Sequence, residues 1–494
     1  MKDYHKVQRD RIKYHAQPSK DTVHRSSLIA SEIPGSDTWV GFINHFLIKR
    51  NYKSIALKIS AIDSNGKLLD TNTIEINEPR VYSFNLSKMF NKFKSKNYLV
   101  EFFSEKNLFI PFPAVIISHK GKDFCNVVHS YNRVINDVFE DDQINKTQVS
   151  EASFDCNIDK NYDTFFNFSS GILPIKNETL ILDYEKNKIK IKKKVKVSIP
   201  RLSYKSFFLS NILSKKLNGG TIRIKQPKQN LFYGRLLAGK MNKKTKAFSA
   251  NHSYYDISNK KEYFSSSKSF RTYPYFENYL NKITMYPIFS PSNLMLQIRV
   301  YNKKGTYVSP KYKFSSSSKS PLNINVNDFV KSKKLKGVSA FTLMAYSLNG
   351  KIPTRVNHQL IYGQISNNNP LNCSINVSLS NEKIFKPKKK TGFVWGQFIN
   401  EKNYFSKIGF CFISPKDEPA NLSIDFYNSK GKFKSINKVL SPEKSLILNA
   451  EEVIGVSKEI DFCWYVAKSD RPDLTAYSVH SNKKSGNFSG EHNF

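Results

Sequence analysis

Cysteine is scarce in this sequence, and no two cysteines form a Cys-x-x-Cys pair. There are five among 494 residues: Cys125, Cys156, Cys373, Cys411 and Cys463. An odd number at wide spacing excludes a framework of disulfide bonds and the paired-thiol motifs of zinc sites. Three of the five lie in apolar runs, where cysteine behaves as a small hydrophobic residue. We therefore expect reduced thiols and a cytoplasmic location.

Long apolar runs are also absent. No stretch of about 18 apolar residues occurs, so we predict no transmembrane segment. The first residues, from Met1 to Gln17, are charged throughout and lack the apolar segment of a secretory signal peptide. Both absences agree with the expected cytoplasmic location.

The motifs of the common catalytic and cofactor-binding classes are missing. There is no Gly-x-x-x-x-Gly-Lys-Ser/Thr loop for phosphates, no Gly-x-Gly-x-x-Gly after a strand, no His-Glu-x-x-His and no Gly-x-Ser-x-Gly. No pair of acids recurs within the chain, as glycosidic hydrolysis would require. The sequence therefore predicts no cofactor, and it leaves any catalytic residue unknown.

Acidic residues are few. Asp and Glu number 40 against 78 Lys and Arg, which gives a net charge of +38. The excess of Lys, Asn, Ile, Phe, Tyr and Ser is typical of an AT-rich genome, and this bias alone explains much of the basicity. The alternative is that the charge attracts a polyanion, such as nucleic acid, an anionic glycan or lipid headgroups. Hydrophobic residues make up 39% of the chain, enough to build packed cores.

The sequence does contain an internal repeat. A short run with a histidine near its end occurs four times, at 124–131, 248–254, 353–359 and 474–481. The histidines follow one another at intervals of 123, 106 and 122 residues, and they are His129, His252, His358 and His480. Recurrence of a motif along a chain is typical of repeat proteins.

Two further features recur in the same order before each histidine. A turn follows the second strand-like run, at 63–66, 184–187, 301–305 and 427–431. A short helical turn comes next, at 85–90, 209–213, 325–330 and 449–454. Each repeat holds about seven short strands, with turn signals every 8–12 residues or so, which favours an antiparallel sandwich. We predict an all-β fold of four tandem antiparallel β-sandwich-like repeats, each with a short helical turn.

The predicted domain boundaries follow from these repeats and from the stretches between them. They are a polar N-terminal arm (1–36), repeat one (37–134), an acidic linker (135–165), repeat two (166–254), a linker (255–275), repeat three (276–362), a linker (363–391), repeat four (392–482) and a polar tail (483–494). Repeats one and two share an insertion that repeats three and four lack. We infer two rounds of duplication, which pair one with two and three with four.

The four histidines allow three interpretations: a side chain that bonds the backbone of a neighbouring strand, a polar group on a binding surface, or a ligand of a shared metal. Imidazole suits iron, zinc and copper, but no acid recurs beside these histidines as the usual partner of a metal ligand. We therefore predict a structural role and no metal. We expect no two of the four to bring imidazole nitrogens within about 4–5 Å. His492 is assigned to a frayed tail, and His119 is expected to have no counterpart.

Lysine clusters supply the candidate anion-binding residues, which are Lys188, Lys190, Lys192, Lys193, Lys194, Lys388, Lys389 and Lys390. A run of lysines is commonly a solvated face, and on an edge strand it also discourages aggregation. The functional interpretation is contact with phosphate or sulfate groups, with aromatic side chains nearby that stack on bases or sugar rings.

Together these patterns predict a non-enzymatic binding protein with a basic surface for an anionic partner. A glycan or envelope precursor is favoured over nucleic acid. Two alternatives stay open. One is an enzyme with a site between repeats that uses the repeated histidines, with or without a metal. The other is a structural assembly subunit whose charge reflects codon bias alone. The sequence predicts no oligomeric state.

Overall fold

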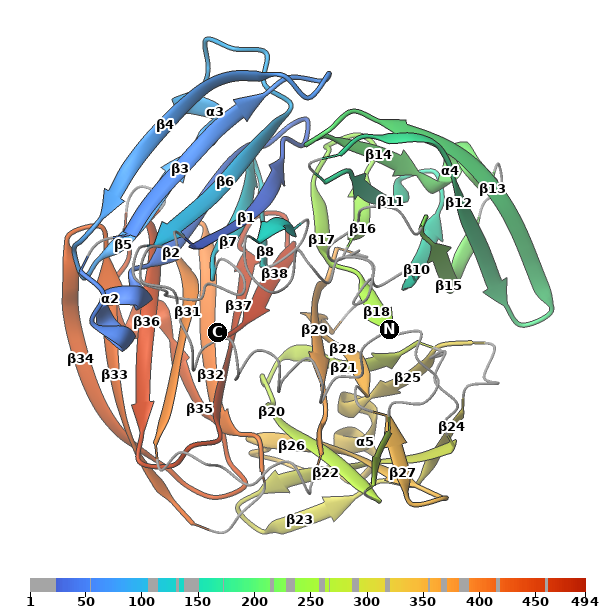
Figure 1. Ribbon diagram of the computed structural model, residues 1–494. Coiled ribbons are helices and arrows are strands. Elements are labelled where there is room, and N and C mark those ends of the chain that lie inside the picture. Colours follow the sequence, from blue (N-terminus) through green and yellow to red (C-terminus); the bar gives the residue numbers. More distant parts are fainter. Residues whose placement is uncertain are drawn as a thin grey trace. The chain divides into compact units, whose positions relative to one another are not determined.

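The chain forms two compact units, residues 1–262 and 263–494, and each is described by itself. Figure 1 shows the computed structural model as a ribbon. The structure describes residues 24–53, 55–104, 114–129, 133–136, 151–171, 173–213, 217–227, 236–256, 263–265, 267–286, 293–315, 320–353, 356–365, 371–381, 391–414, 418–457 and 461–494. Strands dominate these residues, and no helix among them is long and apolar enough to cross a membrane.

Repeat one is built from strands and two short helices: β1 (His24–Ser31), β2 (Asp37–Ile43), α2 (His45–Arg50), β3 (Ile55–Ile62), β4 (Leu68–Ile76), β5 (Val81–Asn85), α3 (Leu86–Met89), β6 (Asn97–Ser104), β7 (Ile116–Gly121), β8 (Phe124–His129) and β9 (Arg133–Asn136). The first sheet has the strand order β4-β3-β6-β1, with β9 beside β1, and the second has the order β5-β2-β7-β8. All pairs are antiparallel.

Repeat two has the same succession of strands, with α4 in the place of α3 and no described helix in the place of α2: β10 (Glu151–Ile158), β11 (Tyr162–Ser169), β12 (Ile175–Lys186), β13 (Ile189–Ile199), β14 (Tyr204–Phe208), α4 (Leu209–Leu213), β15 (Leu217–Lys225), β16 (Leu237–Asn242), β17 (Phe248–His252) and β18 (Tyr254–Asp256). The two sheet orders are β13-β12-β15-β10 and β14-β11-β16-β17. Here β10 also pairs with β11 at one position, so the two sheets are continuous.

Repeat three consists of β20 (Lys268–Pro274), β21 (Tyr279–Met285), β22 (Asn293–Asn302), β23 (Gly305–Val308), β24 (Tyr312–Ser315), β25 (Leu322–Asn325), α5 (Val326–Ser332), β26 (Ala340–Ser347), β28 (Asn357–Gln364), β29 (Cys373–Ser378) and β30 (Ser380–Asn381). A two-stranded ribbon joins β19 (Tyr263–Ser265) to β27 (Lys351–Pro353). The sheet orders are β23-β22-β26-β20-β30, with β24 also beside β22, and β25-β21-β28-β29.

Repeat four consists of β31 (Gly392–Asn400), β32 (Tyr404–Phe412), β33 (Ala420–Asn428), β34 (Gly431–Leu440), β35 (Leu446–Asn449), α6 (Ala450–Ile454), β36 (Asp461–Ser469), β37 (Leu474–Asn482) and β38 (Phe488–His492). Its sheet orders are β34-β33-β36-β31 and β35-β32-β37-β38. The eight strands that all repeats share are numbered one to eight in chain order, and β24 and β27 of repeat three are left out of this numbering. Every repeat then has the orders 4-3-6-1 and 5-2-7-8. The predicted all-β fold of four antiparallel sandwich-like repeats with a short helical turn is confirmed.

The two sheets of a repeat face each other across one apolar core. In repeat four the fully buried residues come from both sheets and include Phe398, Ile408, Phe410, Ile424 and Phe426. They lie at alternate positions of their strands, because successive side chains of a strand point to opposite faces. Burial of each such side chain contributes roughly 1.5–3 kcal/mol.

The predicted boundaries differ from the strand order at several places. The strands β1, β10 and β20 fall in the residues assigned to the arm and linkers, β29 falls in the predicted linker 363–391, and β38 lies in the predicted polar tail. In β10, Phe154, Cys156 and Ile158 are buried, while Asp155 and Asn157 between them are partly exposed. The alternation of a strand is therefore present, but the acidic composition of this stretch hid it.

Within the first unit, repeat two contacts the first sheet of repeat one. Gly66, in the turn between β3 and β4, has φ of +78°, and a Cβ atom there would lie 2.1 Å from the carbonyl oxygen of Arg201. Glycine is required at this position for both reasons. Nearby, the side-chain amide of Asn97 donates to the carbonyl oxygen of Leu202 at 3.3 Å. These contacts hold residues 201–202 against the first sheet of repeat one.

A hydrogen bond closes the corner between strands one and two in three repeats. Thr38, Thr164 and Ser406 donate their hydroxyl groups to the carbonyl oxygen seven residues earlier, at 3.3, 3.1 and 2.6 Å. Each of these three residues lies on strand two, immediately before the residue that pairs with the last residue of strand five. The corner is thus built in the same way in repeats of very different sequence.

The short helix after strand five begins at an asparagine in three repeats. Asn85, Asn325 and Asn449 occupy the N-cap positions of α3, α5 and α6. The side-chain oxygens of Asn85 and Asn325 accept backbone N–H groups of the first turn at 3.0 and 3.1 Å. Asn449 makes no such bond, and its amide donates instead to the carboxylate of Glu452 at 2.8 Å. The same residue type therefore contributes differently in α6.

We expect Asn325→Ala to lower the free energy of unfolding by about 1 kcal/mol, because it removes an N-cap acceptor. Asn449→Ala is the matched control, and it should cost clearly less because its side chain accepts no N–H of the helix. Denaturation by urea, followed by circular dichroism, measures both. Equal losses in the two variants would contradict the distinction between the caps.

Candidate functional site

The strand register shows which of the four repeated histidines are equivalent. His129 and His252 are each the last residue of strand eight, and each pairs with the first residue of strand seven. His358 and His480 lie in β28 and β37, which are seventh strands, and at different positions along them. The repeated motif therefore does not mark equivalent positions in all four repeats, because His358 and His480 lie on a different strand from His129 and His252.

The position of His129 and His252 has counterparts in the other two repeats. The equivalent position is found by following the pairing of strand two with strand seven and then the pairing of strand seven with strand eight. It is occupied by Asn376 in repeat three and by His492 in repeat four. His492 ends β38 and so does not belong to a frayed tail. At this register position, strand eight thus carries histidine in repeats one, two and four and asparagine in repeat three.

Within the first unit, His129 and His252 lie against each other. Their side chains are buried, with 5% and 4% of the surface exposed. The ring centroids are 4.9 Å apart and the ring planes are nearly perpendicular, at 89°. An imidazole nitrogen of each ring lies within 4.8 Å of one on the other. The expectation that no two of these histidines approach so closely is wrong for this pair, because β8 and β17 bring equivalent residues of two repeats together.

A second register position, on strand seven, carries His119, Tyr362 and His480, each opposite strand two. His119 Nε2 and the Tyr362 hydroxyl lie 3.0 and 2.8 Å from the carbonyl oxygen of the last residue of strand one. His480 Nδ1 lies 3.0 Å from the hydroxyl of Ser406, which itself donates to a strand-one carbonyl. His119 therefore has counterparts, contrary to the prediction, and all three side chains brace the corner between strands one and two.

His358 has a different environment within the second unit. Its Nε2 bonds the hydroxyl of Tyr273, and its Nδ1 lies 3.4 Å from the carbonyl oxygen of Val356. The same buried region holds Arg271, whose Nε donates to the hydroxyl of Tyr477 at 2.9 Å. These bonds give the imidazole and the guanidinium partners inside the protein, as buried polar groups require.

Burial determines the charge of three of these histidines. It lowers the pKa of His119 to about 4 and the pKa values of His358 and His480 to about 3. The imidazoles are therefore neutral at pH 7 and hold no proton that they could give up near that pH. Neutral, hydrogen-bonded imidazoles agree with structural roles for His358 and His480.

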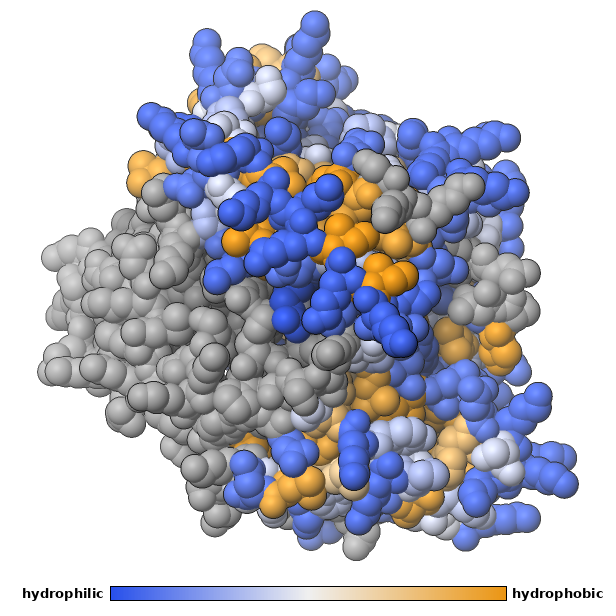
Figure 2. All heavy atoms as spheres, turned by 90° about the vertical axis from the view of Figure 1, so that its right-hand side faces the viewer, coloured by the Kyte–Doolittle hydropathy of each residue, from blue (hydrophilic) through white to orange (hydrophobic). Residues whose placement is uncertain are grey.

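The lysine candidates in repeat two gather at a sheet edge. Lys188, Lys190, Lys192, Lys193 and Lys194 are all exposed, and β13 is the edge strand of its sheet. Figure 2, which looks at the side of the molecule where β12 and β13 lie, shows mostly hydrophilic side chains there, with hydrophobic patches between them. The other three candidates, Lys388, Lys389 and Lys390, lie outside the residues that the structure describes.

Acidic residues of β12 face some of these lysines. Lys190 Nζ lies 3.4 Å from a carboxylate oxygen of Glu185, and Lys192 pairs in register with Asp183. The next lysine on the same face, Lys194, pairs with Ile181. The positive charge is therefore partly compensated at one end of the strand and accumulates toward the other.

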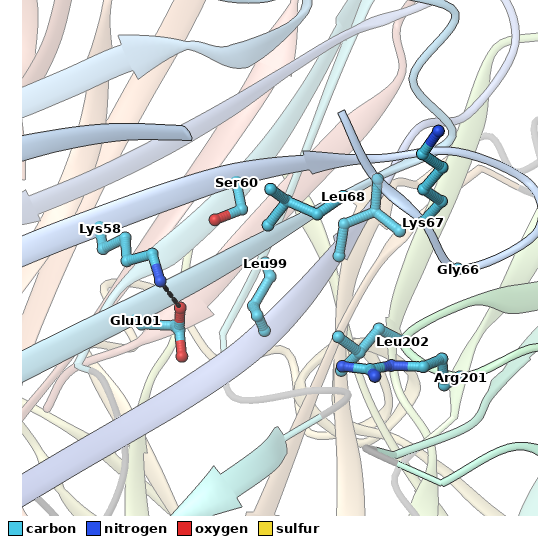
Figure 3. Close-up of a pocket in the computed structure, with 10 residues that line it drawn as sticks. Lys58, Ser60, Gly66, Lys67, Leu68, Leu99, Glu101, Arg201 and Leu202 are labelled. Carbon is cyan, nitrogen blue, oxygen red and sulfur yellow. Dashed lines mark ion pairs between the residues drawn. The ribbon is translucent and has the colours of Figure 1, made fainter. Parts of the chain in front are cut away.

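A cavity that the sequence did not predict lies in the first unit, between the first sheet of repeat one and residues 201–202 (Figure 3). Its cationic residues are Lys58, Lys67 and Arg201, and its floor is formed by leucine and isoleucine side chains. Lys58 Nζ lies 3.6 Å from a carboxylate oxygen of Glu101, whose side chain is only 3% exposed. The lining comes from two repeats, so no local sequence pattern could have revealed it.

Comparison with known proteins does not assign a family. No family model and no curated protein matches this chain. Two solved structures align with 95% of it. One is the tetra-tandem repeat in the extending region of a large adhesion protein, with 10% identity, 98% of that chain covered and a TM-score of 0.11. The other is trypsin-activated alpha-2-macroglobulin from Escherichia coli, with 8% identity, 30% of that chain covered and a TM-score of 0.12. Scores this low carry no argument about fold or function.

We expect the free energy of unfolding to fall as the pH is lowered from 7 to 5. The unfolded chain takes up protons on its histidines near pH 6.5, whereas the buried imidazoles take them up only near pH 3–4. Below the unfolded pKa, each such histidine therefore removes up to about 1.4 kcal/mol of stability per pH unit. Urea denaturation at pH 7, 6 and 5 measures the slope.

The control for this slope is His480→Gln, whose side chain is polar but cannot be protonated. The variant should show a shallower loss of stability on acidification than the unchanged chain. A slope identical to that of the unchanged chain would contradict a neutral His480 in the folded protein.

Proposed function

We propose that this chain is a non-enzymatic binding protein for an anionic glycan and that the edge strand β13 of repeat two is its contact surface. The observation that carries the proposal is the cluster of five exposed lysines within residues 188–194. Four of the five lie on the edge strand β13 and Lys188 lies in the turn before it, so a partner can approach them from the side as well as from the face. Exposed charge of one sign attracts polyanions and accelerates their association.

The spacing of the lysines fits a linear ligand. Lys190, Lys192 and Lys194 point to the same face of β13, because alternate residues of a strand share a face. A rise of about 3.3 Å per residue places their Cα atoms roughly 6.6 Å apart. A linear polymer with sulfate or carboxylate groups at intervals of a sugar unit or two could contact several of them at once.

Aromatic residues bear on single-stranded nucleic acid, one of the polyanions that the sequence left open. Proteins that hold single-stranded nucleic acid without sequence preference stack its bases on aromatic side chains. Among the described residues of β12, β13 and β15 that point away from the core, none is aromatic. Ionic contacts without stacking favour an anionic glycan over single-stranded nucleic acid on this face.

The lysines of β13 are tested by replacing Lys190, Lys192 and Lys194 with glutamine. We expect the triple variant to leave a heparin column at a lower salt concentration than the unchanged chain, because three ammonium groups are lost while their aliphatic stems are kept. Salt should elute both, since exposed charges are screened over about 8 Å at physiological ionic strength. An uncharged agarose column should retain neither.

A matched control removes the same charge elsewhere. Lys331, Lys333 and Lys336 are exposed residues in and after α5, and their replacement by glutamine should leave heparin retention nearly unchanged. Equal losses in the two triple variants would assign retention to net charge alone. No retention of the unchanged chain would favour the structural assembly subunit. If DNA displaced the chain from heparin at a lower concentration of negative charge than heparan sulfate did, nucleic acid would be favoured as the partner.

A further inference from the structure

Two imidazoles in the first unit are placed as ligands of one ion would be. His129 ends β8 and His252 ends β17, so they come from the same register position of two repeats. The two strands lie side by side: the backbone N–H of Ala250 donates to the side-chain oxygen of Asn126 at 2.7 Å. Both histidines are at least nine-tenths buried. Their approach therefore follows from the pairing of the two repeats and not from a flexible surface.

The distances are close to those of a coordination sphere. Imidazole nitrogens of the two rings lie within 4.8 Å of each other. Ligands that bond zinc at 2.0–2.1 Å lie about 3.4 Å apart in tetrahedral geometry. Where the two nitrogens are farther apart than this, binding of an ion would require the rings to rotate about their side-chain torsions.

The surroundings of His252 also suit a metal ligand. Its Nδ1 lies 3.4 Å from the carbonyl oxygen of Ser253. Metal-ligating histidines usually donate the N–H of one ring nitrogen to a carbonyl or carboxylate, and this leaves the lone pair of the other nitrogen directed at the ion. The carbonyl oxygen of Ser253 can orient the ring of His252 in this way.

From these observations we infer that His129 and His252 form a binding site for a divalent transition-metal ion. Neutral imidazole binds copper, nickel, zinc and cobalt, and carboxylate-preferring ions such as magnesium and calcium are not suited to it. The two imidazoles supply two of the ion's ligands. The site lies between β8 and β17, so a bound ion would link repeats one and two and stabilise the first unit.

Two buried histidines can also pack without a metal. The perpendicular rings at 4.9 Å are a geometry that aromatic pairs adopt on their own. In that case the pair would be a packing contact, and removing either ring would change stability without changing metal binding. The two explanations therefore make different predictions for metal affinity.

The experiment uses the full chain, purified without a histidine tag and stripped of metal by a chelator. Copper(II) is titrated and followed by electron paramagnetic resonance, and cobalt(II) is titrated and followed by its visible absorption. We expect one tightly bound copper ion per chain with hyperfine coupling to nitrogen, and an affinity order of copper above nickel above cobalt. Metal should also raise the melting temperature.

The variants are His129→Asn, His252→Asn and the double change. Asparagine is chosen because repeat three carries Asn376 at this register position, so the fold accommodates it. Each single variant should weaken copper binding strongly and lose the increase in melting temperature. His480→Gln, which removes a buried histidine from a different position, should keep both.

Two results would overturn the inference. One is the absence of a tightly bound ion with nitrogen coupling in the unchanged chain. The other is a double variant that, folded by circular dichroism, binds copper as the unchanged chain does. Should the variants fail to fold, the nitrogen coupling and the metal-dependent melting temperature of the unchanged chain decide alone. In that case, we expect the metal-dependent increase in melting temperature to be lost after the histidines are carbethoxylated.

Discussion

The antiparallel pairing of strand seven with strand two on one side and strand eight on the other sets the position of every histidine discussed here. Because side chains alternate between the two faces of a sheet, a shift of one residue in this pairing would exchange buried and exposed side chains along the strand. The pairing is the same in all four repeats. It places one side chain at the corner between strands one and two, and another at the end of strand eight.

The fold could be predicted because its signals are local. Turns, short helical turns and alternating apolar residues each occupy a few neighbouring positions, and their order is repeated. The first strands were missed where composition hid the alternation. In β10 the inward residues Phe154, Cys156 and Ile158 are separated by polar ones, in a stretch otherwise rich in acids. A search for alternation alone, without regard to charge, would have found this strand.

The equivalence of the histidines could not be predicted from their spacing, because spacing along the chain counts loop residues as well as strand residues. The interval between His129 and His252 joins equivalent positions. The nearly equal interval between His358 and His480 does not, since one is the second residue of β28 and the other is the seventh of β37. Only the pairing partners reveal that His492 corresponds to His129.

The lysines of β13 illustrate how one residue type can meet two demands. An edge strand with charged side chains resists pairing with the edges of other molecules, and acids on β12 keep part of that charge compensated. This structural demand is satisfied by Lys190 and Lys192, which face Glu185 and Asp183. It does not require Lys193 and Lys194, which pair with Leu182 and Ile181, and their charge supports the proposed contact with an anionic partner.

The two groups of histidines differ in what their side chains contact. At the strand-seven corner, burial lowers the pKa values of His119 and His480, because desolvation disfavours the charged imidazole. At the strand-seven corner, His119 and His480 lie against backbone or hydroxyl groups, so the ring is used as a hydrogen-bonding partner. At the end of strand eight, His129 and His252 lie against each other, and we propose that they bind a single cation together. Duplication of one register position therefore creates, between two repeats, a donor set that neither repeat has alone.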